Sequence, residues 1–162
     1  MKGVGAVEIL QLVLSVLICQ LSGLVGAYFT APSISEWYVY LKKPSFTPPS
    51  WLFAPVWTIL FATMGISVFL VWRQRSLGKQ VKRAVAVFGV QLVLNVFWSA
   101  AFFGLRSPIA GLVVIVVLWL AILLTILEFY RLSKSAALLL VPYILWVSFA
   151  ASLNYSIFIM NL

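Results

Sequence analysis

Four polar and aromatic residues in segment 81–103 could contact a ligand. Gln91, Asn95, Trp98 and Ser99 are spaced i, i+4, i+7 and i+8, which places them on one face of a helix. The segment is otherwise apolar enough for a bilayer, where an unpaired amide costs several kcal/mol. This face should therefore point into a helix bundle, either to hydrogen-bond other helices or to hold a ligand.

Segment 135–160 offers a matching face with Tyr143, Trp146, Ala150 and Asn154. Trp51 and Trp57 add two rings at the start of segment 51–72. Tryptophans can simply fill an interior, but a small alanine among rings leaves room for a flat molecule. Apolar aromatic walls with few polar groups are typical of a small-molecule site. The pattern favours a large, planar, hydrophobic ligand.

The composition excludes several other chemistries. The 162 residues include no histidine and one cysteine, Cys19, so zinc, haem-iron and histidine-based triad chemistry lack their usual groups. We expect no metal site, and a single cysteine forms no internal disulfide. Eleven basic against three acidic residues could suggest nucleic acid. The basic residues lie in short gaps between apolar runs, so lipid headgroups are the expected partner and nucleic acid is not.

Apolar and aromatic residues make up 64% of the chain, which predicts an all-α integral membrane protein with one domain, residues 1–162. Spanning helices need about 20 apolar residues. Five such runs are present, at roughly 4–29, 51–72, 81–103, 107–130 and 135–160. We expect Pro32 to end the first and Pro142 to kink the last. Ser107 and Pro108 should open the fourth. The first run also resembles a signal peptide, but its length and the four later spans favour a retained helix.

Basic residues are unequally divided between the two ends of the predicted bundle. Eight lie at the end with the N-terminus and three at the other, which predicts a cytoplasmic N-terminus. The eight are Lys2, Arg73, Arg75, Lys79, Lys82, Arg83, Arg131 and Lys134, and the three are Lys42, Lys43 and Arg106. The first loop, 31–50, would then face outward. Its four prolines and several rings suggest a stiff lid, although an interfacial aromatic belt would look similar.

The motifs of this loop and of two helices resemble the TspO/MBR family, the tryptophan-rich sensory proteins related to the animal translocator protein or peripheral benzodiazepine receptor. The resemblance covers nearly the whole chain. It is carried by Trp37-Tyr38, residues 41–51 (LKKPSFTPPSW), residues 53–57 (FAPVW), residues 91–95 (QLVLN), Trp98-Ser99, Phe102-Phe103, Pro142-Tyr143, Trp146, Phe149-Ala150 and Leu153-Asn154.

The resemblance implies a five-helix bundle that binds porphyrins, including protoporphyrin IX and haem-pathway intermediates, and benzodiazepine-type ligands beneath the first loop. By motif, Trp37 would belong to the lid, Trp57 and Trp146 would be facing rings, and Asn95 would be a polar contact. The full set of expected ligand-binding residues is Trp37, Trp51, Trp57, Gln91, Asn95, Trp98, Tyr143, Trp146 and Ala150.

Three functions follow from the resemblance. The first is a tetrapyrrole receptor that regulates or buffers porphyrins in stress. The second is light- and oxygen-dependent degradation of protoporphyrin IX, with Trp57 and Trp146 as catalytic residues. The third is porphyrin or sterol transport. Ionisable residues lie near helix ends rather than mid-span, which disfavours coupled pumping.

Partners and location are also expectations of the resemblance. Animal relatives bind cholesterol through a motif with a basic residue after Leu-Asn-Tyr, but residues 156–162 after Tyr155 contain no Lys or Arg. Cholesterol is therefore not expected, although residues 127–134 fit the same loose pattern. A bacterial cell membrane and a homodimer are expected. Small residues that permit close helix contact are Ser15, Cys19, Ser22, Gly23, Gly26, Ala100 and Gly104.

Overall fold

The computed structural model describes residues 5–162, and the regular structure in that range is helical, without strands. Five helical segments are long and apolar enough to cross a membrane, as the sequence predicts. The helices are α1 (Ala6–Glu36), α2 (Phe53–Trp72), α3 (Lys79–Ser99), α4 (Pro108–Leu132), the short α5 (Lys134–Leu139) and α6 (Val141–Met160). Lys2, counted in the charge asymmetry, lies outside the described residues.

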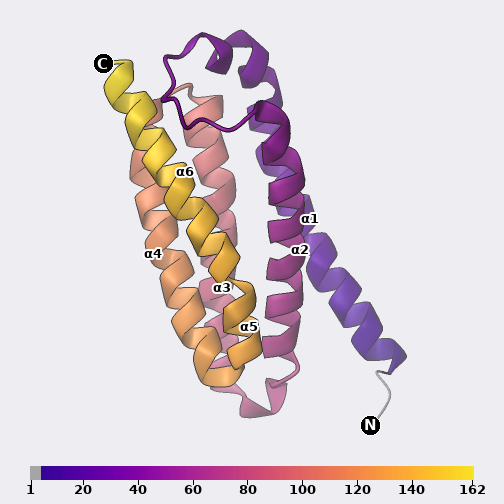
Figure 1. Ribbon diagram of the computed structural model, residues 1–162. Helices are drawn as coiled ribbons and strands as arrows, with labels where there is room; N and C mark the ends of the chain where they lie inside the picture. The colour runs from indigo at the N-terminus through magenta and orange to yellow at the C-terminus, as the bar shows by residue number, and fades with distance from the viewer. Residues whose placement is uncertain (1–4) are drawn as a thin grey trace.

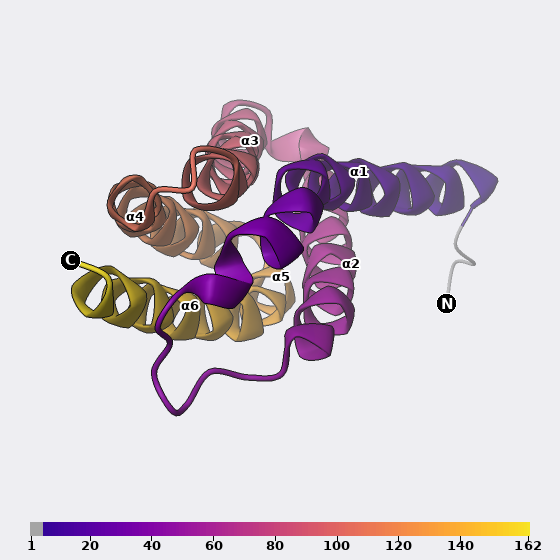
Figure 2. The same ribbon diagram turned by 90° about the horizontal axis from the view of Figure 1, so that it is seen from above.

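The helices form a closed ring when seen along the bundle (Figures 1 and 2). Contacts run from α1 to α2, from α2 to α5, through α6 to α4, then to α3 and back to α1. The N-terminal half of α1 slants away from the other helices (Figure 1). The lid crosses one end of the ring, and the loop between α2 and α3 lies at the other end (Figure 1).

Pro32 does not end the first helix, so the predicted boundary at residue 29 is wrong. Helix α1 continues through Pro32 to Glu36. Proline is tolerated in membrane helices where neighbouring helices supply other contacts. Here the Ser33 hydroxyl donates to the Phe103 carbonyl at 2.6 Å, which ties this turn to α3's end. The lid is consequently shorter than predicted and covers residues 37–52, with 3₁₀ turns at Tyr38–Tyr40 and Ser50–Leu52.

The last span is broken rather than kinked. Helix α5 ends at Leu139 and α6 begins at Val141, so Pro142 occupies the first turn of a new helix. That position needs no backbone N–H, which removes the cost of an interior proline. The fourth span starts as predicted, because the Ser107 hydroxyl accepts from the Ala110 N–H at 3.3 Å ahead of Pro108.

Helix α3 ends in a π-helical turn, Ala100–Gly104, in which the Leu105 N–H donates to the Ala100 carbonyl at 2.8 Å. No pattern in the sequence predicts this turn. Such turns rotate the following side chains relative to a regular helix and are frequent at functional sites. Here the turn carries Phe102 and Phe103, both of which line a cavity.

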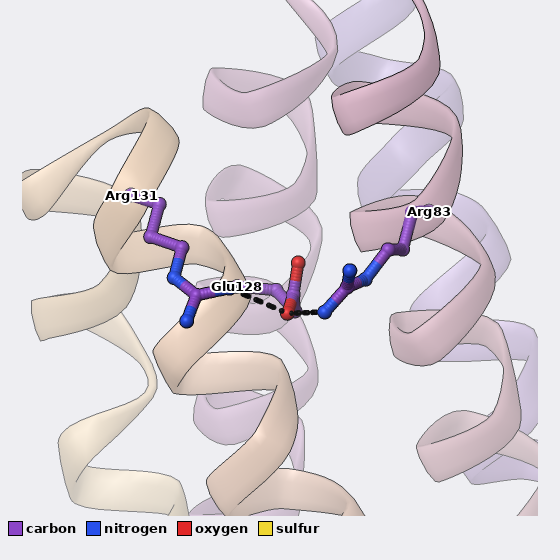
Figure 3. Close-up of polar contacts among 3 residues, drawn as sticks. All are labelled: Arg83, Glu128 and Arg131. Carbon is purple, nitrogen blue, oxygen red and sulfur yellow. Dashed lines mark hydrogen bonds and ion pairs between the residues drawn. The ribbon is translucent and has the colours of Figure 1, made fainter.

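The end opposite the lid carries the basic residues of the α2–α3 loop and of α4. Glu128 on α4 pairs there with Arg131, as its i+3 spacing predicts, at 3.2 Å. Arg83 on α3 binds the same carboxylate from the other side (Figure 3). This bridge joins α3 to α4 at the end of the bundle opposite the lid.

Candidate ligand-binding cavity

A cavity of about 430 Å³ lies beneath the lid and between α1, α2, α3 and α6. This volume falls within the usual range of small-molecule sites. Its roof includes Tyr38 and Phe53, and its floor is set by Phe61 on α2. All four helices supply lining residues. They include Gly26, Trp57, Asn95, Trp98, Ala150 and Asn154.

Aromatic rings form a continuous cluster along one side of the cavity. The ring centroids of Trp57 and Trp98 are 6.2 Å apart with planes inclined by 34°. Trp98 in turn stacks on Phe102 at 6.0 Å, and Trp57 contacts Phe61 at 5.6 Å. Aromatic pairs at such separations favour one another beyond simple burial. The cluster gives the cavity broad, flat walls.

A buried hydrogen-bond chain holds the polar wall in place. Asn95 donates through Nδ2 to the Tyr143 hydroxyl at 2.9 Å, and that hydroxyl donates to Gln91 Oε1 at 3.0 Å. These two bonds fix the Asn95 amide and leave its Oδ1 with no partner among the described residues. Asn95 therefore presents a hydrogen-bond acceptor at the cavity wall.

A second chain orients Trp98. Its indole N–H donates to Asn154 Oδ1 at 3.3 Å, and Asn154 Nδ2 donates to the Pro108 carbonyl at 2.8 Å. The indole N–H is thus satisfied inside the protein. Trp98 offers its ring face, rather than its donor, to a ligand.

The structure brings four of the nine predicted ligand-binding residues to the cavity wall: Trp57, Asn95, Trp98 and Ala150. Gln91 and Tyr143 lie one layer behind, where they position Asn95. Trp37 lies beside the site, with its ring edge-on to Phe102 at 5.5 Å.

Two predicted tryptophans lie outside the lining. Trp51 is 71% exposed, because it belongs to the 3₁₀ turn ahead of α2 and points away from the bundle. Trp146 is half-buried and packs against Phe53 at 5.9 Å and Phe149 at 5.6 Å. Phe53 lines the cavity in its place.

One face of α1 lines the cavity and was not among the predicted site residues. It consists of Gln20, Gly23, Leu24, Gly26, Ala27, Thr30, Ala31 and Ile34. Gly23 and Gly26 are small residues that also allow α1 to approach the neighbouring helices closely. A Cβ at Gly23 would lie 2.6 Å from the Phe61 ring, and one at Gly26 would lie 3.1 Å from Ser99 Oγ.

The sequence profile of the TspO/MBR family matches residues 15–160. The chain belongs to the TspO/MBR family.

Relatives of this TspO/MBR chain span bacteria and animals. It is 50% identical to the tryptophan-rich protein TspO of Chlorobaculum tepidum over 154 residues, which cover 95% of this chain and 98% of the relative. It is 38% identical to the human translocator protein over 136 residues, 82% and 79% of the two chains. The tryptophan-rich sensory protein of Cereibacter sphaeroides is 34% identical over 126 residues, 78% and 77% of the two chains.

The cavity of this TspO/MBR protein is electrically neutral. Within residues 5–162, no acidic or basic side chain lines it. Tyr38 at the roof is the one titratable lining group outside the spans, and burial raises the pKa of its phenol. Among the described residues, the lining is therefore aromatic and aliphatic with few polar groups.

Proposed function

We propose that this TspO/MBR protein is a membrane receptor that binds tetrapyrroles such as protoporphyrin IX, and benzodiazepine-type ligands, in the cavity beneath the lid. Binding there would buffer or sense porphyrins under stress. The observation that carries this proposal is the pairing of flat aromatic walls with one open acceptor, Asn95 Oδ1.

The chemistry of a free-base porphyrin complements this site. Its macrocycle is planar and apolar, and matches the Trp57 and Trp98 ring faces. Its inner pyrrole N–H groups point to the centre of the macrocycle, so Asn95 Oδ1 would instead accept from a donor at the edge of the ligand or from a bridging water. Its carboxylates need water or cations, and these are available at the lid, where Lys42 is exposed. A neutral cavity with a basic rim therefore suits a molecule that is apolar at its centre and acidic at its edge.

A titration of purified protein with protoporphyrin IX in darkness tests the proposal. Ala150→Phe should weaken binding by about tenfold or more, because the added ring occupies cavity space. Trp51→Phe is the matched control and should bind like wild type, since Trp51 faces outward. Equal affinity in all three proteins would overturn the proposal.

A second candidate function is light- and oxygen-dependent breakdown of the bound porphyrin. The Trp57–Trp98 pair favours it, because oxidisable indoles lie beside the place where an excited macrocycle would bind. The test is to illuminate bound and free protoporphyrin IX and compare products. Identical products and rates would leave a receptor without this activity.

Transport, the third function suggested by the resemblance, gains less support. No acidic or basic side chain of the kind that couples transport to ions lines the cavity within the described residues. Equal porphyrin flux into empty and protein-containing liposomes would argue against passive transport as well.

Location and assembly complete the proposal. We place the protein in a bacterial cell membrane with its N-terminus in the cytoplasm, because basic residues cluster at the end opposite the lid. A homodimer is proposed as well. Surface accessibility of single cysteines introduced in the lid and the α2–α3 loop would test the orientation.

A further inference from the structure

A second cavity of about 430 Å³ lies at the other end of the bundle, between α1, α2 and α3. It shares no lining residue with the cavity beneath the lid. Its walls are almost entirely apolar, with the Gln11 amide, Ser15 hydroxyl and Cys19 thiol on α1 as the polar exceptions. The lining comprises Gln11, Leu14, Ser15, Ile18, Cys19, Val68, Trp72, Val85, Phe88, Gly89 and Leu92.

Gly89 is the most informative residue of this second cavity. A glycine inside a helix costs roughly 0.5–1 kcal/mol relative to alanine. Such a glycine is usually required by a close neighbour, as at Gly65, where a Cβ would lie 2.5 Å from Val16 Cα. At Gly89 a Cβ would meet nothing within 4 Å. Packing does not require glycine there, and its effect is to keep the cavity open.

The second cavity opens sideways to the bilayer. Leu14, Ile18 and Trp72 line it and are 48%, 57% and 42% exposed. The slant of α1 away from the bundle leaves this side uncovered (Figure 1). A molecule already dissolved in the membrane could thus slide one chain between the helices without crossing water.

Two exposed lysines of α3 lie at the end of this cavity nearest the α2–α3 loop. Glu8 on α1, at the same end, is paired with Arg73 at 3.4 Å. Lys82 lies one turn ahead of the lining residue Val85 on the same face of α3, and Lys79 lies one turn further. Both are exposed and neither forms an ion pair within residues 5–162. Positive side chains in a first turn are disfavoured by the helix dipole, so an anion at this place would be stabilised. Helical side chains lean toward the N-terminus, which here points to the headgroups.

We propose that this second cavity binds one acyl chain of an anionic phospholipid, with its headgroup phosphate at Lys79 and Lys82. The apolar lining accounts for the chain, and the two unpaired lysines account for the charge. The lateral opening accounts for access. This site is independent of the tetrapyrrole proposal, because the two cavities lie at opposite ends of the bundle.

Native mass spectrometry of delipidated protein, titrated with phosphatidylglycerol or with phosphatidylcholine of identical chains, tests the proposal. Wild type should retain one phosphatidylglycerol with about tenfold preference over phosphatidylcholine. Gly89→Leu should abolish this retention by filling the cavity. The variant should still fold, since the space is open and leucine favours the helix. Lys82→Gln should reduce the preference and leave the affinity for phosphatidylcholine unchanged.

Val93→Leu is the matched control, because it adds one methylene on the lipid-facing side of α3, outside both cavities. It should retain lipid like wild type. Unchanged retention in Gly89→Leu, or retention of oleate in place of phosphatidylglycerol, would overturn the proposal.

Discussion

Asn161, just beyond α6, holds the backbone of Lys42 in the lid through two hydrogen bonds. The Lys42 N–H donates to Asn161 Oδ1 at 3.0 Å, and Asn161 Nδ2 donates to the Lys42 carbonyl at 2.9 Å. The same Nδ2 also donates to the Ile157 carbonyl at 2.8 Å, which fixes the amide on its helix. One side chain near the C-terminus thus fastens the lid above the cavity. Lys43 stabilises the same part of the lid, because its Nζ donates to the Val39 and Leu41 carbonyls, both at 3.2 Å.

Loss of this fastening should speed ligand release. Asn161→Ala removes both bonds to the lid, worth about 0.5–1.5 kcal/mol each, so protoporphyrin IX should dissociate about tenfold faster. Stopped-flow fluorescence measures this rate. Asn161→Asp keeps the acceptor for the Lys42 N–H but loses the donor to the Lys42 carbonyl. Its dissociation rate should lie between those of wild type and Asn161→Ala. A dissociation rate unchanged in Asn161→Ala would show that the lid is held by other contacts.

The Asn95 acceptor should contribute directly to ligand affinity. Asn95→Leu removes it and should weaken protoporphyrin IX binding by about tenfold. Tyr143→Phe keeps the acceptor but leaves Asn95 Nδ2 and Gln91 Oε1 unpaired. It should therefore lower thermal stability in detergent more than affinity. The opposite ranking of the two variants in the binding titration would contradict the role given to Asn95.

Trp57 and Trp146 should differ in any porphyrin photochemistry. Trp57 lines the cavity, whereas Trp146 packs behind Phe53. Trp57→Phe should slow protein-dependent breakdown of protoporphyrin IX under light, and Trp146→Phe should stay near wild type. Absorbance decay of the bound porphyrin measures both. An equal loss in the two variants would mean that Trp146 is involved in the breakdown despite lying outside the lining.

Two glycines should respond oppositely to the same substitution. Gly65→Ala places a Cβ 2.5 Å from Val16 Cα, so α1 and α2 must move apart. We expect a loss of about 1–3 kcal/mol in unfolding free energy. Gly89→Ala meets nothing within 4 Å and should gain about 0.5–1 kcal/mol from helix propensity. Thermal unfolding in detergent tests both, and a destabilised Gly89→Ala would contradict the open space described at that position.

The number of spans and most of their bounds could be predicted because hydropathy and length decide them. The errors fall at prolines. Pro32 reads as a helix end, yet contacts from another helix keep α1 intact. Pro142 suggests a kink inside a helix, yet the helix is interrupted at Leu140, which places Pro142 in the first turn of α6. Whether a proline is tolerated depends on neighbours that are distant in sequence.

The interior face of α3 was predictable, since a buried amide such as Asn95 has to point inward. Helical spacing did not reveal which rings reach the cavity. Trp51 and Trp146 share the same apolar context as Trp57, and their directions are set by the turn before α2 and by packing on Phe53. The sequence shows that Gly23 and Gly26 belong to a row of small residues on α1. Such a row is expected at a helix contact as well as at a cavity wall, so it did not identify the cavity.

The location of bound protoporphyrin IX tests the central claim most directly. An experimental structure of the complex should show the macrocycle beneath the lid between Trp57 and Ala150, with its edge against Asn95. A macrocycle bound on the lipid-facing surface, with the cavity empty, would contradict the account.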